Sequence, residues 1–202
     1  MKYVSLLILV ACASFVCAGQ TPSGSTGKSR CTLTRAQAPE IRGIRLGMTA
    51  EQIAALFPED GNRLRISEAV KQSRKAQNYG VARFDLQPER ETPNPRFAGV
   101  NFITIELLDE RVTGFHVGYI GPEWNSVDQF VAKLSETLRL PGVSWEQAGD
   151  NARLMCDGFA MNASVSSGST QSWVRVQDTS TARVVEDRRQ VDKEKARQAF
   201  KP

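Results

Sequence analysis

The side chain best suited to acid–base chemistry is His116, the single histidine among the 202 residues of the chain. A second histidine is needed for a HExxH zinc site or any other two-histidine metal site, so such sites are excluded. No GxSxG motif supplies a nucleophile for a triad with His116. One titratable residue without partners does not make an active site. We therefore interpret His116 as a histidine at the rim of the core, and expect no metal and no cofactor.

Three carboxylates lie close together in the sequence, Glu106, Asp109 and Glu110. These residues support an alternative interpretation, in which the protein is a carboxylate-dependent enzyme. Acid–base catalysis by two carboxylates requires environments that push their pKa values apart. Two of these three acids fall at an expected hairpin tip, in water, where no such difference arises. The sequence thus predicts a protein that is not an enzyme.

The first 18 residues are typical of a secretory signal peptide, with Lys2, an apolar run and small residues at the cleavage site. Cleavage after Ala18 leaves 184 of 202 residues and predicts export to the periplasm or the medium. One alternative is a structural envelope lipoprotein, because Leu9 to Cys12 matches a bacterial lipobox. In that case Cys12 would be lipidated and would anchor the chain to a membrane.

Cleavage after Ala18 also leaves only two cysteines, Cys31 and Cys156. A pair of cysteines in an exported protein predicts one disulfide. The alternative is two unpaired, buried thiols. The residues before the first periodic segment, 19–40, begin with a stretch rich in Ser, Thr, Gly and Pro, and we expect a flexible spacer there.

The charge pattern does not indicate a partner. The formal net charge is +4, and both signs are interspersed along the chain. A nucleic-acid binder shows a basic stripe with interleaved aromatic residues, which this sequence lacks. We therefore expect no nucleic acid among its ligands, and contact with a membrane only if Cys12 is lipidated.

The elements that position these residues are marked by a repeated phrase. Thr49 is followed three residues later by Gln52, and Ser126 by Gln129, which is the capping-box pattern of a helix start. Helices are expected after both caps and from Arg65 to Gln77. The spacing of the two phrases favours two tandem units, 41–121 and 122–178, followed by a charged helical tail, 179–202.

Each unit is expected to continue as a three-stranded antiparallel meander. The strands are predicted at 79–86, 100–108 and 111–120, and at 152–156, 159–165 and 172–177. Around the turn at Asp109 and Glu110, the predicted pairs are Leu107 with Val112, Ile105 with Gly114, and Ile103 with His116. This register places an aliphatic face under the helices and leaves an open face, whose candidate binding residues are Phe102, Thr104, Phe115, Val117, Tyr119 and Trp173.

The phrase from Ile44 to Ile53, read with the strands after it and its second copy at Ser126, resembles the β-lactamase-inhibitor-protein-like fold. Its Gly-Met-Thr opening is also similar to that of small lipoproteins of the outer-membrane barrel assembly machinery, and of uncharacterised exported bacterial families. The resemblance implies an α+β fold of two tandem units with helices on one face of the sheet. It also implies that the open face binds a protein. The sequence therefore predicts an exported, non-catalytic module of the bacterial envelope or secretome that binds another envelope or secreted protein.

Overall fold

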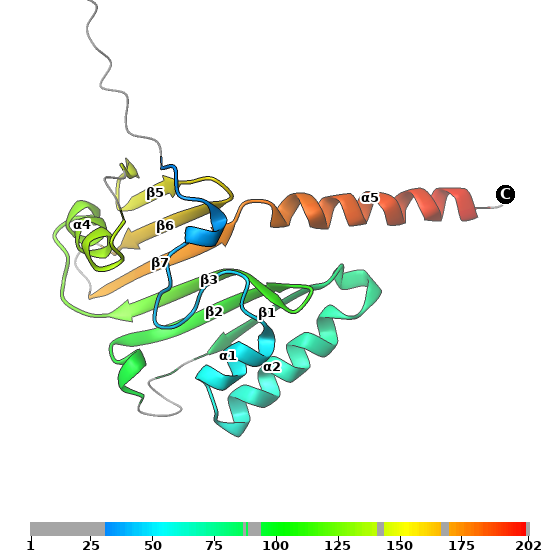
Figure 1. Ribbon diagram of the computed structural model, residues 1–202, viewed down its shortest axis with the longest axis horizontal. Coiled ribbons are helices and arrows are strands. Elements are labelled where there is room, and N and C mark those ends of the chain that lie inside the picture. Colours follow the sequence, from blue (N-terminus) through cyan, green and yellow to red (C-terminus); the bar gives the residue numbers. More distant parts are fainter. Residues whose placement is uncertain (1–30, 87, 89–93, 141–143, 167–169, 201–202) are drawn as a thin grey trace, which may run out of the picture.

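The computed structural model of the chain describes residues 31–86, 88, 94–140, 144–166 and 170–200. The predicted signal peptide, Cys12 and the first part of the predicted spacer lie outside these residues. Within them the fold is mixed α+β, as predicted: four α-helices accompany one antiparallel sheet of seven strands (Figure 1). None of the described helices has the length and apolar character needed to cross a membrane.

The sheet is continuous, with its strands in the order β1-β2-β3-β7-β6-β5-β4. The prediction of two separate three-stranded meanders is wrong, because β3 pairs with β7 and the second half of the chain adds a short strand, β4. The pairing satisfies backbone groups that two separate sheets would leave exposed at their edges. The strands are Val81–Leu86 (β1), Val100–Leu108 (β2), Arg111–Ile120 (β3), Glu146–Ala148 (β4), Asn151–Met155 (β5), Phe159–Val165 (β6) and Gln171–Asp178 (β7).

The two predicted helix starts are confirmed. At Thr49 the capping box is complete: the threonine oxygen accepts the backbone N–H of Gln52 at 3.2 Å, and the Gln52 side chain accepts the N–H of Thr49 at 2.9 Å. At Ser126 the side chain accepts the N–H of Gln129 at 3.4 Å. The four helices are Ala50–Leu56 (α1), Asp60–Ser73 (α2), Val127–Thr137 (α4) and Thr181–Ala199 (α5).

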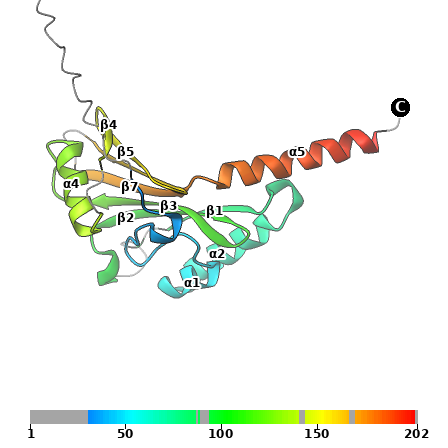
Figure 2. The same cartoon turned by 45° about the horizontal axis from the view of Figure 1, so that its top comes forward.

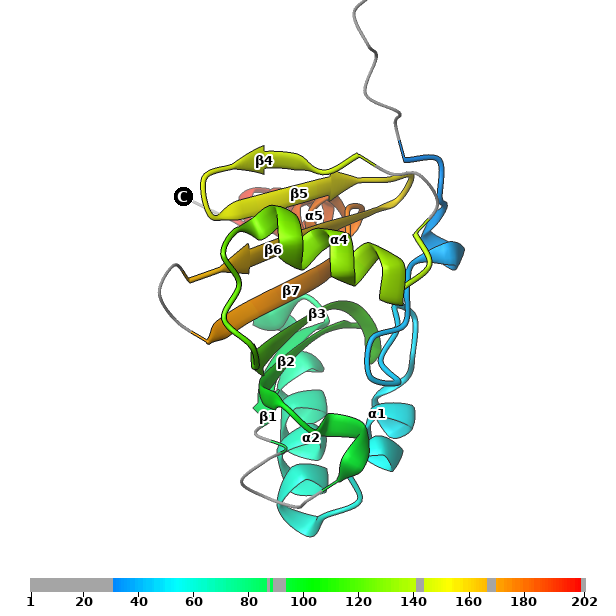
Figure 3. The same ribbon diagram turned by 90° about the vertical axis from the view of Figure 1, so that its left-hand side faces the viewer.

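Helices α1, α2 and α4 lie on the same face of the sheet (Figures 1 and 3). Helix α2 packs beside β1, whereas α4 packs over β5 and β6. Alternate side chains of every long strand meet these helices in one hydrophobic cluster that spans both halves of the chain. Its strand residues include Phe84, Ile103, Ile105, Val174, Val176, Met161 and Leu154.

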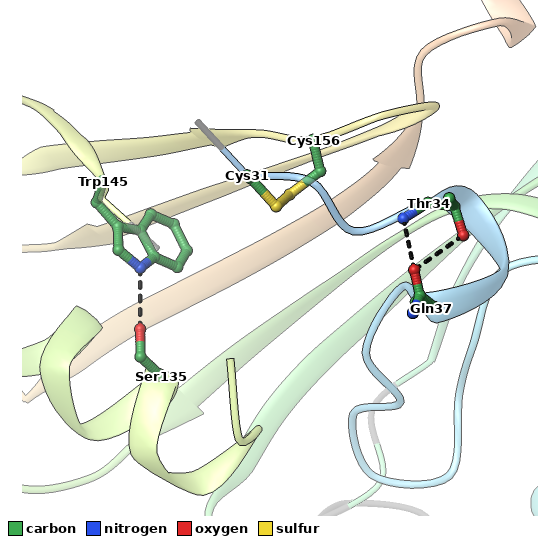
Figure 4. Close-up of a disulfide and its surroundings, with 6 residues drawn as sticks. All are labelled: Cys31, Thr34, Gln37, Ser135, Trp145 and Cys156. Atoms are coloured by element: carbon green, nitrogen blue, oxygen red, sulfur yellow. Dashed lines mark hydrogen bonds between the residues drawn. A yellow bond between two sulfur atoms is a disulfide. The ribbon is translucent and has the colours of Figure 1, made fainter. Parts of the chain in front are cut away.

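The segment before α1 crosses this covered face and is held there. Cys31 and Cys156 form a disulfide, which confirms the predicted pairing (Figure 4). Thr34 then forms a parallel bridge with Asp157. Farther along, Ile41 and Ile44 are buried in the core. Residues 31–40, which the sequence assigns to a spacer, are thus part of the packed structure.

The predicted register of the β2–β3 hairpin is wrong by one residue beyond its first pair. Leu107 pairs with Val112 as predicted, but Ile105 pairs with Phe115 and Ile103 with Val117. The cause is a β-bulge, in which Thr113 is an extra residue on β3 with no partner on β2. Because side chains alternate along a strand, this one insertion exchanges the two faces of β3 beyond the bulge.

Helix α5 follows β7 and extends away from the rest of the molecule (Figures 1 and 2). Its first turns are fixed to the first half of the chain. Arg188 donates to both carboxylate oxygens of Asp109, at 2.9 and 2.6 Å, and to the carbonyl of Tyr79 at 2.7 Å. Of the 19 residues of α5, only Val185 is buried.

Candidate binding face

The structure separates the six residues predicted to form a binding face. Phe102, Thr104 and Trp173 lie on the face of the sheet that no described helix covers, called the open face below. Phe115 and Val117 lie on the covered face, with 1% and 0% of their surface exposed. Tyr119 is also on the covered face, where it packs against the core. The assignment of these last three residues to an open face is therefore wrong, because of the bulge at Thr113.

An aromatic row crosses the middle of the open face, formed by Phe102 on β2, His116 on β3 and Trp173 on β7. The ring centroids of Phe102 and His116 are 4.9 Å apart, and those of His116 and Trp173 are 4.8 Å apart, both edge to face. This geometry is the one that aromatic pairs prefer. Gly118 makes the row possible, because a Cβ at that position would collide with the ring of Phe102.

A charged cluster lies beside the aromatic row. Arg175 on β7 donates through Nη2 to both carboxylate oxygens of Glu106 on β2, at 2.8 and 2.9 Å. The Glu106 side chain reaches across β3 over Gly114, where a Cβ would lie 2.8 Å from its Oε2. Arg83 on β1 approaches the same carboxylate at 4.0 Å. The two glycines of β3 thus allow side chains of β2 to lie flat across the strand.

A hydrogen bond fixes the β1 side of the open face. The hydroxyl of Thr104 donates to Asp85 Oδ1 at 2.6 Å, and Thr104 is 5% exposed. Thr104 stands directly opposite His116 in the sheet. Because its hydroxyl proton is directed to Asp85, Thr104 is not poised to give that proton to His116.

His116 is held in a site that disfavours its charged form. Burial lowers its pKa below the usual value of 6.5, and the positive charges of Arg175 and Arg83 lower it further. The carboxylates of Glu106 and Asp85 act in the opposite direction. Its Nε2 is buried and has no hydrogen-bond partner among the described residues. His116 is therefore neutral at neutral pH and packs as an aromatic ring between Phe102 and Trp173.

The three carboxylates considered as candidates for a carboxylate-dependent enzyme are each paired with an arginine. Glu106 binds Arg175, Asp109 binds Arg188, and Glu110 binds Arg74 at 2.6 Å. The hydrogen bond from Arg188 lowers the pKa of Asp109. Within the described part of the chain, no group of three or more His, Cys, Asp or Glu side chains is arranged to hold a metal ion.

Sequence reasoning missed His116, Arg175 and Glu106 as members of one surface. The alternation of β3 placed His116 on the covered face, because nothing in the residue types marks the bulge. One signal was present. Gly114 and Gly118 flank His116 at a spacing of two, and glycines on one face of a strand indicate the close approach of another group.

No protein-family model, curated protein or solved structure matches this chain, so its resemblance to the β-lactamase-inhibitor-protein-like fold stays a prediction.

Proposed function

We propose that this chain is an exported, non-catalytic protein-binding module of the bacterial envelope or secretome, and that the open face binds another envelope or secreted protein. The observation that carries the proposal is the aromatic row of Phe102, His116 and Trp173, which lies on a sheet face that no described helix covers. Side chains of this kind are common anchors in protein interfaces.

The fixed geometry of the open face supports this proposal. The contacts among Phe102, His116 and Trp173, and the hydrogen bonds from Arg175 Nη2 to both carboxylate oxygens of Glu106, hold these side chains before any partner arrives. Binding then loses less side-chain entropy than it would with mobile groups. The resemblance to a fold whose open sheet face grips a protein favours the same surface.

The chemistry of the described residues supports a binding role over a catalytic one. His116 has no hydrogen bond through Nε2 to orient it as a base, and the nearby hydroxyl of Thr104 is committed to Asp85. The disulfide between Cys31 and Cys156 is compatible with an oxidising compartment outside the cytoplasm.

Site-specific photo-cross-linking in the source cell tests the proposal. A photoreactive residue at position 102 or 173 should give one defined cross-linked protein. The matched control is position 64 on α2, where Leu64 is 69% exposed on a helix outside the sheet. That position should give no such product.

Affinity measurements with the identified partner complete the test. Trp173→Ala should weaken binding about thirtyfold, the loss of about 2 kcal/mol expected of an aromatic anchor. Leu64→Ala should leave the affinity unchanged. Equal cross-linking at positions 64, 102 and 173, or an unchanged affinity for Trp173→Ala, would refute the open face as the interaction surface.

A further inference from the structure

A hollow opens beside the aromatic row, on the open face over β4 to β7. Its volume is about 410 Å³, within the range of small-molecule sites. The hollow exists because β6 carries only short side chains on this face, Ala160, Asn162 and Ser164, between larger side chains on its neighbours. Its lining includes Trp173, Arg175, Asn162, Arg153 and Glu146.

The sheet register brings four polar side chains into one row across this hollow. Arg175 pairs with Asn162, Asn162 with Arg153, and Arg153 with Glu146. Neighbouring strands are about 4.8 Å apart, so the four groups span a length of about 15 Å. A ligand of several linked rings could contact all of them at once.

Much of the hydrogen-bonding capacity in this row is unused. Arg175 uses Nη2 alone, on Glu106, and its Nε and Nη1 have no partner among the described residues. Arg153 and Asn162 make no side-chain hydrogen bond or ion pair to any residue that the structure describes. The row thus offers guanidinium and amide donors together with amide and carboxylate acceptors.

The charges in the hollow are balanced. The positive charge of Arg175 is neutralised by Glu106, and Arg153 stands opposite Glu146 on the adjacent strand. A phosphate or a polyacid would find no net positive charge to attract it. The balance favours a neutral ligand that both donates and accepts hydrogen bonds.

Trp173 provides an apolar surface at the edge of the row. His116 packs on the β3 side of the indole, and the other side lines the hollow. The faces of aromatic rings carry partial negative charge, which attracts the polarised C–H groups of a sugar ring. Sugar hydroxyls act as donors and acceptors at the same time, and this matches the mixed groups of Arg153, Asn162 and Glu146.

We propose that this hollow binds a neutral oligosaccharide, with one ring against Trp173 and its hydroxyls bonded to Arg153, Arg175, Asn162 and Glu146. This binding goes beyond the proposed protein-binding function. Trp173 belongs to both surfaces, whereas Phe102 lies outside the hollow and Asn162 and Arg153 lie outside the aromatic row, so variants at these three positions test the two functions separately.

Titration of the exported protein with chitotriose, cellotriose and maltotriose, each alone, tests the inference. Calorimetry and tryptophan fluorescence should detect at least one of them below about 10 mM, a weak affinity that suits a shallow site. Trp173→Ala should abolish the binding. Asn162→Ala and Arg153→Ala should each weaken it about tenfold through lost hydrogen bonds.

The control is Arg63→Ala, which removes an exposed guanidinium from α2, outside the hollow and the open face, and should leave the sugar affinity unchanged. Thermal melts establish that each variant is folded. The inference is overturned if none of the three sugars binds, if Asn162→Ala binds as the wild type does, or if an acidic trisaccharide of galacturonate binds while the neutral sugars do not. Retained partner cross-linking at position 102 together with absent sugar binding would support the protein-binding function and reject the hollow.

Discussion

Replacing Phe115 by alanine tests the register of the sheet, and with it which face is open. Phe115 is 1% exposed, stands between Ile105 on β2 and Val176 on β7, and belongs to the core. Removal of a buried phenyl ring leaves a cavity, which costs about 3 to 5 kcal/mol of unfolding free energy. Phe102 supplies the matched control, because it has the same side chain, on the neighbouring strand, but faces the other way.

Phe102→Ala should lower the unfolding free energy much less than Phe115→Ala does. The ring is partly exposed and loses chiefly its contact with His116 at 4.9 Å. Such a pair contributes about 0.5 to 1.5 kcal/mol beyond the area that it buries, so the total loss should be about 1 to 2 kcal/mol. The two variants should therefore differ by about 2 to 3 kcal/mol.

Urea denaturation followed by circular dichroism measures both losses, with thermal melts as a second readout. For a domain of this size, 1 kcal/mol corresponds to about 2 to 4 °C in Tm, so Phe115→Ala should melt about 6 to 20 °C below the wild type. If Phe102→Ala is the more damaging variant, the face assignment is reversed. The open face, the aromatic row and the proposed binding surface would then all be rejected.

Three further predictions concern the covalent link, the helix caps and pH. Replacing Cys31 and Cys156 together by serine should lower the unfolding free energy by about 4 to 5 kcal/mol, since their bond closes a sequence separation of 125 residues; unchanged urea midpoints would contradict this. Thr49→Ala should lower the unfolding free energy by about 1 to 2 kcal/mol, and Ser126→Ala by about 0.5 to 1 kcal/mol, because the complete capping box is at Thr49. A larger loss for Ser126→Ala in urea midpoints would contradict this prediction. Because the pKa of His116 is lowered in the folded protein, the unfolded chain binds the proton at a higher pH, so the unfolding free energy is constant above pH 6.5 and falls below it until the folded pKa is reached. His116→Gln should reduce this pH dependence in urea midpoints measured from about pH 7.5 to 5. An unchanged pH dependence would show that another group titrates.

Local signals in the sequence predicted the elements well. The caps at Thr49 and Ser126 depend on a hydroxyl and a glutamine three residues apart, and both mark helix starts in the structure. The hairpin around Asp109 and Glu110 was also predicted with the observed strand limits, because β-branched and apolar residues fill both strands. These features arise from residues that are close in sequence.

The arrangement of the elements required information that is not local. Strand β4 was missed because its three residues are all exposed and show no alternation. The pairing of β3 with β7 joins strands from opposite ends of the domain, and no residue type marks which edges will meet. The bulge at Thr113 decides which side of the sheet carries His116 and which carries Phe115, although it changes no local pattern.

The order of the strands also constrains how the chain can fold. Strand β7 is the last one in the sequence, yet it lies between β3 and β6 and completes the sheet. During synthesis β3 therefore emerges with an unpaired edge, and that edge stays open until residues 171–178 have left the ribosome. Pairings between distant parts of a chain form slowly, and open edges are sites where chains associate wrongly. A chain that ends before β7 would expose two central edges at once, so loss of this one strand should be far more harmful than loss of the projecting helix that follows it.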